Sequence, residues 1–400
     1  MSLAPPLHLA VALDGAGWHP AAWRAEGARP GELFTGGYWA DLVGEAERGL
    51  LDFVTIDDSL AVQSARRGVP DDRLDQVRGR LDAVLVASRV APATSRIGII
   101  PVATTTHTEP FHLSKAIATL DYVSAGRAGV QVRVSASQIE AAQFGRRTIP
   151  APPAPNPDGR DSPPRGGDLL DEAADFVEVM RRLWDSWEDD AEIRDATTGR
   201  FIDRDKLHYI DFEGRWFSVR GPSITPRPPQ GQPLVTALAH ETGPYRLAAR
   251  SADAVFVTPH DLDRVRAIEA EVRTEEAATG RLGERLRVFA DLVVFLDDRP
   301  GAAAARKARL DELDGHVYRS DALVFTGTPG ELAEHLEEWS VEGVAGFRLR
   351  PAVLPYDLEA VTRNLVPVLQ QRGRFRRGYE GATLRSRLGL SRPPNRYATA

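Results

Sequence analysis

The stretch DEAADFVEVMRRLWDSWEDDA (Asp171–Ala191) decides which fold this chain can adopt. Its apolar residues recur with helical period and two tryptophans stand near its end, so a long helix is predicted. Two proline-containing segments follow, VRGP (Val219–Pro222) and PRPPQGQP (Pro226–Pro233), and the second leads directly into an apolar run that begins at Leu234. A long helix that connects one apolar run to the next is typical of a parallel sheet with crossover helices.

Short apolar or β-branched runs alternate with helical segments along the rest of the chain. We predict strands at Leu7–Leu13, Phe53–Ile56, Ile97–Pro101, Gly129–Val134, Leu234–Ala237, Ala254–Val257, Val288–Phe295 and Gly346–Leu349. Helices are predicted at Tyr38–Leu50, Leu74–Val90, Pro110–Val123, Leu169–Trp187, Gly243–Ser251, Asp261–Thr279, Ala302–Leu313 or Pro329–Val341, and Leu358–Leu369. Strand and helix alternating in this way predict a (β/α)8 TIM barrel, which needs about 250 residues and tolerates inserted loops.

The surplus length lies in three segments, so we expect one barrel domain over residues 1–400. A proline-rich insertion at about 140–168 is too poor in apolar residues to pack alone and is expected to form a loop or lid. A second insertion at 192–232 mixes aromatic and charged residues and predicts short strands or irregular structure. The arginine-rich segment 372–400 is interpreted as a docking arm in preference to a nucleic-acid patch.

Composition narrows the class of function. The chain of 400 residues is 42% hydrophobic and carries a formal net charge of -7, which favours a small-molecule substrate over nucleic acid or a membrane surface. It contains no cysteine, so thiolate metal sites and a cysteine nucleophile are excluded. No run of about 18 apolar residues is present. We expect a cytoplasmic protein.

Three separated motifs resemble one known family. They are the helix and proline segments above, GWHPAAWR (Gly17–Arg24) and LDYVSAGR (Leu120–Arg127). In this order they resemble the bacterial luciferase-like flavin monooxygenases, in particular the branch of nitrilotriacetate monooxygenase and dibenzothiophene-sulfone monooxygenase. The resemblance implies a luciferase-like barrel.

The same resemblance implies an activity. Reduced FMN from a separate NAD(P)H flavin reductase would react with dioxygen to oxidise a small organic substrate, in a homodimer or homotetramer. The lack of a GxGxxG motif agrees with a separate reductase. Two alternatives stay open: a deazaflavin-dependent oxidoreductase, and a flavin-binding barrel with little catalytic activity.

Candidate site residues follow from the rule that barrel enzymes place their chemistry where strands end. Asp58 follows the second predicted strand, Thr104 and Thr105 follow the third, and Gln131 lies in the fourth. The resemblance makes these four the predicted flavin contacts, with Gln131 where relatives have asparagine. For Asp58 the alternative is capping of the next helical turn, and for the threonines it is turn formation and capping.

Three further residues are predicted to face substrate or peroxide. His19 lies in the first motif, and His240 and Glu241 follow the fifth predicted strand. A structural histidine bonded to backbone is the alternative for His19. No metal is expected, because Pro110 places His107 and Glu109 in the loop before a helix and His112 within that helix.

The predicted phosphate site departs from the family pattern. Relatives hold the flavin phosphate with an Arg-Tyr pair and a Ser-Ser pair, where this chain has Leu169-Leu170 and His240-Glu241. A glutamate would repel a phosphate, so the anion must be held differently or be absent. Arg146, Arg147 and Arg165 are the nearest candidates in sequence.

Overall fold

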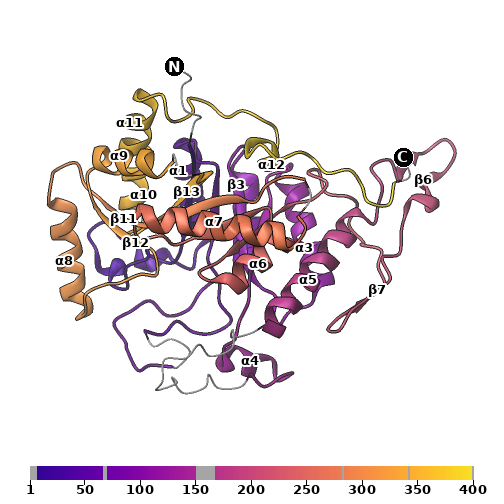
Figure 1. The fold of residues 1–400 in the computed structure, drawn as a ribbon, viewed down its shortest axis with the longest axis horizontal. Helices are drawn as coiled ribbons and strands as arrows, with labels where there is room; N and C mark the ends of the chain where they lie inside the picture. Colours follow the sequence, from indigo (N-terminus) through magenta and orange to yellow (C-terminus); the bar gives the residue numbers. More distant parts are fainter. Residues whose placement is uncertain (1–6, 66–69, 150–166, 282, 341–342, 399–400) are drawn as a thin grey trace.

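Parallel strands close into a barrel in the computed structural model, which describes residues 7–65, 70–149, 167–281, 283–340 and 343–398 (Figure 1). The strands are β1 (His8–Leu13), β2 (Phe53–Ile56), β3 (Gly98–Thr104), β4 (Gly129–Arg133), β9 (Leu234–Leu238), β10 (Ala254–Val257), β11 (Arg287–Leu296) and β13 (Gly346–Pro351). They pair in that order, and β13 pairs with β1 to close the ring. The predicted (β/α)8 barrel is confirmed.

One more parallel strand, β12 (Leu323–Gly327), lies outside the predicted set. Strand β11 is long enough to pair with β10 through its first half and with β12 through Leu292–Leu296. Strand β13 pairs along one edge of β11. The other edge pairs first with β10 and then, beyond the end of β10, with β12. The barrel is therefore extended between β10 and β11 at the end where the strands terminate.

Helices surround the barrel (Figure 1). They are α1 (Gly36–Arg48), α2 (Ala83–Val90), α3 (Pro110–Val123), α5 (Gly167–Asp185), α6 (Thr242–Ser251), α7 (Leu262–Ala278), α8 (Ala302–Asp314), α9 (Pro329–Ser340), α10 (Tyr356–Ala360) and α11 (Val366–Gln371). Pro110 begins α3, where its missing N–H costs nothing. A π-helical turn, Val361–Leu365, joins α10 to α11.

The predicted helix Leu74–Val90 is correct only in its last half. Helix α2 begins at Ala83, and Leu74 is 95% exposed in an irregular segment. The carboxylate of Asp71 accepts hydrogen bonds from the N–H of Arg73 and from Ser64, so it competes with helical hydrogen bonding. The Arg80 guanidinium turns inward to Asp14. Polar contacts across the loop therefore override the helical pattern.

The C-terminal segment seals the end of the barrel where the strands begin. A short helix, α12 (Leu384–Arg387), places Leu384, Leu388 and Leu390 in one buried cluster with Ala10, Phe53, Ile100, Leu234, Ala254, Phe256 and Phe289 of the barrel strands. Burying each such leucine contributes about 1.5–3 kcal/mol. Within this buried arm Arg385 pairs with Asp253 at 3.1 Å.

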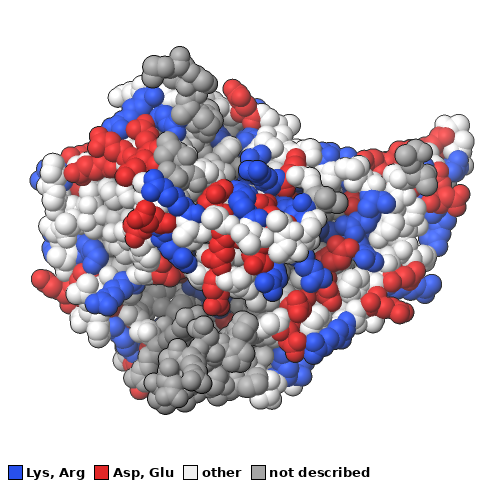
Figure 2. Space-filling view, in the orientation of Figure 1, with Lys and Arg blue, Asp and Glu red and all other residues white. Residues whose placement is uncertain are grey.

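The insertion after α5 projects from one side of the barrel (Figure 1). It contains two hairpins, β5 (Glu192–Asp195) with β6 (Arg200–Ile202), and β7 (Phe212–Glu213) with β8 (Ser218–Val219). The end of the arm lies along it, because Tyr397 stacks on His208 at 5.1 Å. In the first insertion, helix α4 (Gln138–Phe144) is described, while residues 150–166 of the expected lid lie outside the described residues. Figure 2 shows positive and negative side chains interspersed over the face in view.

Candidate active site

The strand ends form a mouth that holds two adjoining cavities. The inner cavity, about 190 Å³, is lined by Ala12, Trp18, Thr55, Asp57, Val102, Gln131, Leu238, Asp321, Arg348 and Arg350. The outer one, about 890 Å³, is bounded by residues within 14–20, 63–65, 71–77 and 314–319. Trp18 belongs to both linings. This is the end of a barrel at which enzymes of this fold carry out their chemistry.

Strand β13 and the first loop together place Trp18 in that position. The backbone N–H groups of Trp18 and His19 donate to the carbonyls of Pro351 and Ala352, at 3.0 Å each. Gly17, with φ +129°, lies so close to Ala352 that a Cβ would clash with its backbone, so glycine is required. The Trp18 indole N–H donates to Ala12 and its ring lies 4.7 Å from the Arg350 guanidinium.

Two buried arginines define the inner cavity. Arg348 and Arg350 alternate along β13 and therefore point to the same side, into the barrel. Both bind the carboxylate of Asp291 on β11, and all three side chains are at most 3% exposed. Arg350 also donates to Asp321 at 2.7 Å. This cluster was missed in the sequence, where the pattern RLR at a strand end was the available signal.

Gln131 lies in this cavity, among the groups predicted to contact flavin. Its side-chain oxygen accepts a hydrogen bond from Arg348 at 2.6 Å. Among the described residues, no hydrogen bond from its amide nitrogen is found, and the residue lines the cavity. Arg348 therefore holds the side-chain oxygen of Gln131, and the amide nitrogen presents a hydrogen-bond donor to the cavity.

Asp58 lies at the edge of the mouth and bonds to backbone. Its two oxygens accept from the N–H groups of Ser59 at 2.7 Å and Ala83 at 3.0 Å. Burial raises the pKa of Asp58, while these backbone donors lower it. The capping role considered as an alternative is present in this structure.

Asp14 and Arg80 form an ion pair beside Asp57 that sequence reasoning did not identify. Arg80 Nη2 donates to both carboxylate oxygens of Asp14, at 2.8 and 2.9 Å. Its Nη1 lies 3.3 Å from the Asp57 carboxylate. Burial raises the pKa of Asp14 to about 6, and the Arg80 charge opposes that rise. The strand ends of β1 and β2 are therefore linked through one guanidinium.

Thr104 and Thr105 are buried where β3 meets the β4 edge of the mouth. The Thr105 hydroxyl donates to the carbonyl of Arg133 at 3.2 Å, and Thr104 Oγ1 accepts from the Arg133 guanidinium at 3.4 Å. Arg133 also pairs with Glu140 of α4 at 3.0 Å. The threonines fasten the β3 and β4 ends together.

His19 is buried, and both its ring nitrogens are bonded within the protein. Nδ1 accepts from the N–H of Ala21 at 3.1 Å, so the proton is on Nε2, which donates to Asp311 at 3.1 Å. Burial lowers the pKa of His19. This arrangement is the one expected of a structural histidine, although the residue borders the outer cavity.

His240 and Glu241 lie at the end of β9, on the opposite side of the mouth. His240 is half-exposed; its Nδ1 lies 2.9 Å from the Thr258 hydroxyl and its Nε2 lies 3.6 Å from Asp321. Glu241 is exposed and precedes α6, where its side chain makes no capping hydrogen bond. His240 therefore approaches the arginine cluster through Asp321.

The arginines considered for a phosphate carry other partners. Arg147 makes two 2.6 Å hydrogen bonds to Glu172 of α5, and Arg146 bonds Glu109 at 2.6 Å. Arg165 lies outside the described residues. Of the two leucines at the predicted phosphate site, Leu170 packs against Gly243.

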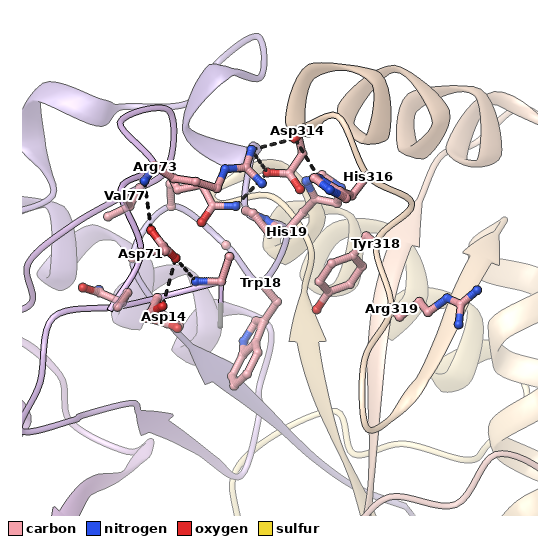
Figure 3. Close-up of a pocket in the computed structure, with 18 of the residues that line it drawn as sticks. Asp14, Trp18, His19, Asp71, Arg73, Val77, Asp314, His316, Tyr318 and Arg319 are labelled. Carbon is pink, nitrogen blue, oxygen red and sulfur yellow. Dashed lines mark hydrogen bonds and ion pairs between the residues drawn. The ribbon is translucent and has the colours of Figure 1, made fainter. Parts of the chain in front are cut away.

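The outer cavity is held open by polar links between loops (Figure 3). Asp14 and Asp71 lie on one side, and Asp314, His316 and Tyr318 on the other. Arg73 and Gln76 both donate to Asp314, at 2.9 and 2.8 Å. These bonds tie the loop after β2 to the C-terminus of α8.

The described residues include neither a metal-ligand cluster nor a membrane-spanning helix. Among them no group of three or more His, Cys, Asp or Glu side chains is arranged to hold a metal ion. No helix in the same part of the chain is both long and apolar enough to cross a membrane.

The fold is a (β/α)8 barrel with a mouth at the carboxyl ends of its strands. Residues 18–346 match the family model described as luciferase-like monooxygenase. The chain therefore belongs to the luciferase-like monooxygenase family.

Relatives cover almost the entire chain. It is 30% identical to N-acetyl-S-(2-succino)cysteine monooxygenase of Bacillus subtilis (strain 168), over 98% of each protein. It is also 30% identical to nitrilotriacetate monooxygenase component A of Aminobacter aminovorans, again over 98% of each. The structure of the long-chain alkane monooxygenase LadA superimposes with a TM-score of 0.85 at 22% identity, covering 97% of this chain and 96% of that one, which shows the shared fold.

Proposed function

We propose that this chain is the oxygenase component of a two-component monooxygenase, which takes reduced FMN from a separate NAD(P)H flavin reductase and uses dioxygen to oxidise a small organic molecule. Full-length similarity to two monooxygenases at 30% identity is the main support. The relatives' names span a cysteine derivative, an aminopolycarboxylate and an alkane, so family membership alone does not select the substrate.

The residues at the mouth fit a flavin ring. A ring edge offers carbonyl oxygens and nitrogens, and Gln131 presents an amide donor into the inner cavity next to the apolar side chains of Val102 and Leu238. When bound, reduced flavin supplies the electrons that activate dioxygen. Gln131, Thr104, Thr105 and Asp58 would hold it, while Trp18 excludes water from the inner cavity.

His240 is proposed to face the substrate, and His19 and Glu241 to act from the rim. Its half-exposed imidazole lies 3.6 Å from the Asp321 carboxylate, at the mouth where a substrate would enter. His19 has its proton fixed on Nε2, so its contribution would be to position the first loop. A cytoplasmic homodimer or homotetramer belongs to the same proposal and is tested by light scattering.

Anaerobic titration tests the flavin assignment directly. We expect reduced FMN to bind, and Gln131→Leu to weaken that binding about tenfold, the effect of losing one well-placed hydrogen bond. Gln371→Leu is the matched control, because Gln371 is exposed and lines neither cavity. Binding of deazaflavin in preference to FMN would instead support a deazaflavin-dependent oxidoreductase.

Turnover is tested with a supplied reductase, NADH and a panel of amines, sulfides, sulfones and organic acids. Oxygen uptake above that of free flavin must be accompanied by an oxygenated product. Flavin binding with no product from any member of the panel would favour the flavin-binding barrel with little activity.

A further inference from the structure

The two buried arginines of the inner cavity outnumber the carboxylates that bind them within the barrel. Arg348 and Arg350 share a single carboxylate, Asp291, and the exposed fractions of the three side chains are 3%, 2% and 0%. One positive charge is left over within this cluster of three. A second anion beside Arg350 is therefore favoured, either from the chain or from a ligand that enters the cavity.

Asp321 supplies that anion from outside the barrel wall. It belongs to the segment before β12 and its side chain is 45% exposed, unlike the three groups beneath it. One of its oxygens lies 2.7 Å from Arg350, and the same carboxylate accepts from Ser320 at 3.0 Å. Burial raises the pKa of Asp321, but Arg350 lowers it to about 2, so the group is a carboxylate at neutral pH.

We propose that the substrate is a small organic acid whose carboxylate binds Arg350 in place of Asp321. This rests on the proposed function, because it names the substrate class of the same mouth. Asp321 then acts as an internal substitute that keeps Arg350 neutralised until the acid arrives.

The geometry around Arg350 favours a carboxylate. A guanidinium donates two parallel hydrogen bonds to a planar carboxylate, which adds orientation to charge. The acid would leave Gln131, Val102 and Leu238 to the flavin ring and lie on the Arg350 side of the inner cavity, where Trp18 is 4.7 Å from the guanidinium. Its carbon skeleton would extend past Trp18 into the adjoining outer cavity of about 890 Å³.

Two neighbouring groups are arranged so that the exchange is possible. Asp57, the other carboxylate in the lining, lies 3.3 Å from Arg80, which offsets its repulsion of an incoming acid. His240 lies 3.6 Å from Asp321 and would remain close to it as it leaves Arg350. A neutral ligand would leave the Arg350–Asp321 pair in place.

Calorimetric titration of the flavin-free protein tests the proposal without turnover. The probes are succinate, its neutral analogue succinamide, and inorganic phosphate. We expect saturable binding of succinate, weaker binding of phosphate, and no binding of succinamide. Asp321→Asn removes the internal competitor and should tighten succinate binding about tenfold. Asp190→Asn, which removes an exposed carboxylate paired with Lys206, should leave the affinity unchanged.

Arg350→Lys completes the design, since it keeps the charge and loses the paired donors, and it should weaken succinate binding. Three results would overturn the proposal: no succinate binding by either the native protein or Asp321→Asn, an equal gain in Asp190→Asn, or phosphate binding as tight as succinate. The titration contains no flavin or oxygen, so succinate binding would still support the acid proposal even if the protein oxygenated no substrate. Conversely, an active oxygenase that does not bind succinate would refute only the assignment of an acid substrate.

Discussion

The two ends of the barrel contain the same kinds of charged side chain in opposite surroundings. At the closed end Asp253 is bound by Arg181, Arg385 and a backbone N–H, beneath the C-terminal arm. At the open end Arg350 meets Asp321, which is half-exposed and borders a cavity. Removing a charge from the Asp253 cluster can only break it, whereas Arg350 can exchange Asp321 for another anion.

This difference separates structural from functional ion pairs. A buried carboxylate held by several chain segments stabilises one arrangement of the backbone, and its loss leaves opposite charges stranded. A carboxylate from a surface segment can be replaced by water or by a ligand. Accessibility to a cavity therefore distinguishes the two kinds of pair better than the pairing distance does.

Removing the Asp253 charge should destabilise the closed end and have the largest effect on the free energy of unfolding among the substitutions proposed here. Asp253→Asn leaves Arg181 and Arg385 without their carboxylate and should lower the free energy of unfolding by about 3–5 kcal/mol. Burial raises the pKa of Asp253, but Arg181 and Arg385 lower it to about 2, so its contribution is present above pH 3.8 and is lost as pH falls towards 2. Urea unfolding at pH 7 measures the loss, with Asp190→Asn as control. A change below 1 kcal/mol would show that the closed end is not held by this group.

The arm itself is tested by Leu384→Ala. Leu384 is fully buried against Phe53 and Gly98, so truncation should cost about 3 kcal/mol from lost burial and the cavity left behind. Leu74→Ala, at a position 95% exposed, is the matched control and should change stability by less than about 0.5 kcal/mol. Equal effects in the two variants would mean that the arm does not seal the barrel.

Most of the fold could be predicted because parallel strands are buried on both faces. Phe53–Ile56 and Ala254–Val257 consist of apolar or β-branched residues throughout, and the structure places β2 and β10 at those bounds. Strand β12 was missed because all its residues are only half-buried and it pairs with the extension of β11 alone. Local pattern does not reveal a strand that depends on a distant edge.

Only single residues of the candidate site could be predicted, from the rule that barrel enzymes place their chemistry where strands end. That rule pointed to Gln131, which lines the inner cavity, and to Asp58, whose bond from the N–H of Ala83 is the capping role named as its alternative. It did not reveal that Arg348 and Arg350 meet Asp291, 57 and 59 positions away. Such partners are set by the closure of the barrel, which no local spacing encodes.

Asp121 sharpens the comparison, because it is a closed-end carboxylate bonded to neutral donors. It accepts from the Gln230 backbone and side chain and from Ala128 N–H, at 3.1, 2.6 and 3.1 Å. Burial raises its pKa to about 6, so the native state favours the protonated form and stability falls as pH rises through that value.

For Asp121 the linkage relation gives a loss of roughly 1–1.5 kcal/mol between pH 5 and 7.5. Asp121→Asn cannot titrate, so the difference in unfolding free energy between the two proteins should change by that amount over this pH range. Guanidinium unfolding at several pH values measures it. A difference that stays constant with pH would mean that Asp121 has the same pKa folded and unfolded.

The smallest effect on stability is expected at the open end, from Asp321→Asn. Arg350 keeps Asp291, the asparagine oxygen still accepts a hydrogen bond, and water in the cavity can solvate the freed guanidinium, so the loss should be about 1 kcal/mol or less. Urea unfolding of Asp321→Asn and Asp253→Asn under the same conditions compares the two losses of unfolding free energy. A loss near 3 kcal/mol would place Asp321 with the structural carboxylates of the closed end, since a group that the fold needs so strongly could not give way to a ligand.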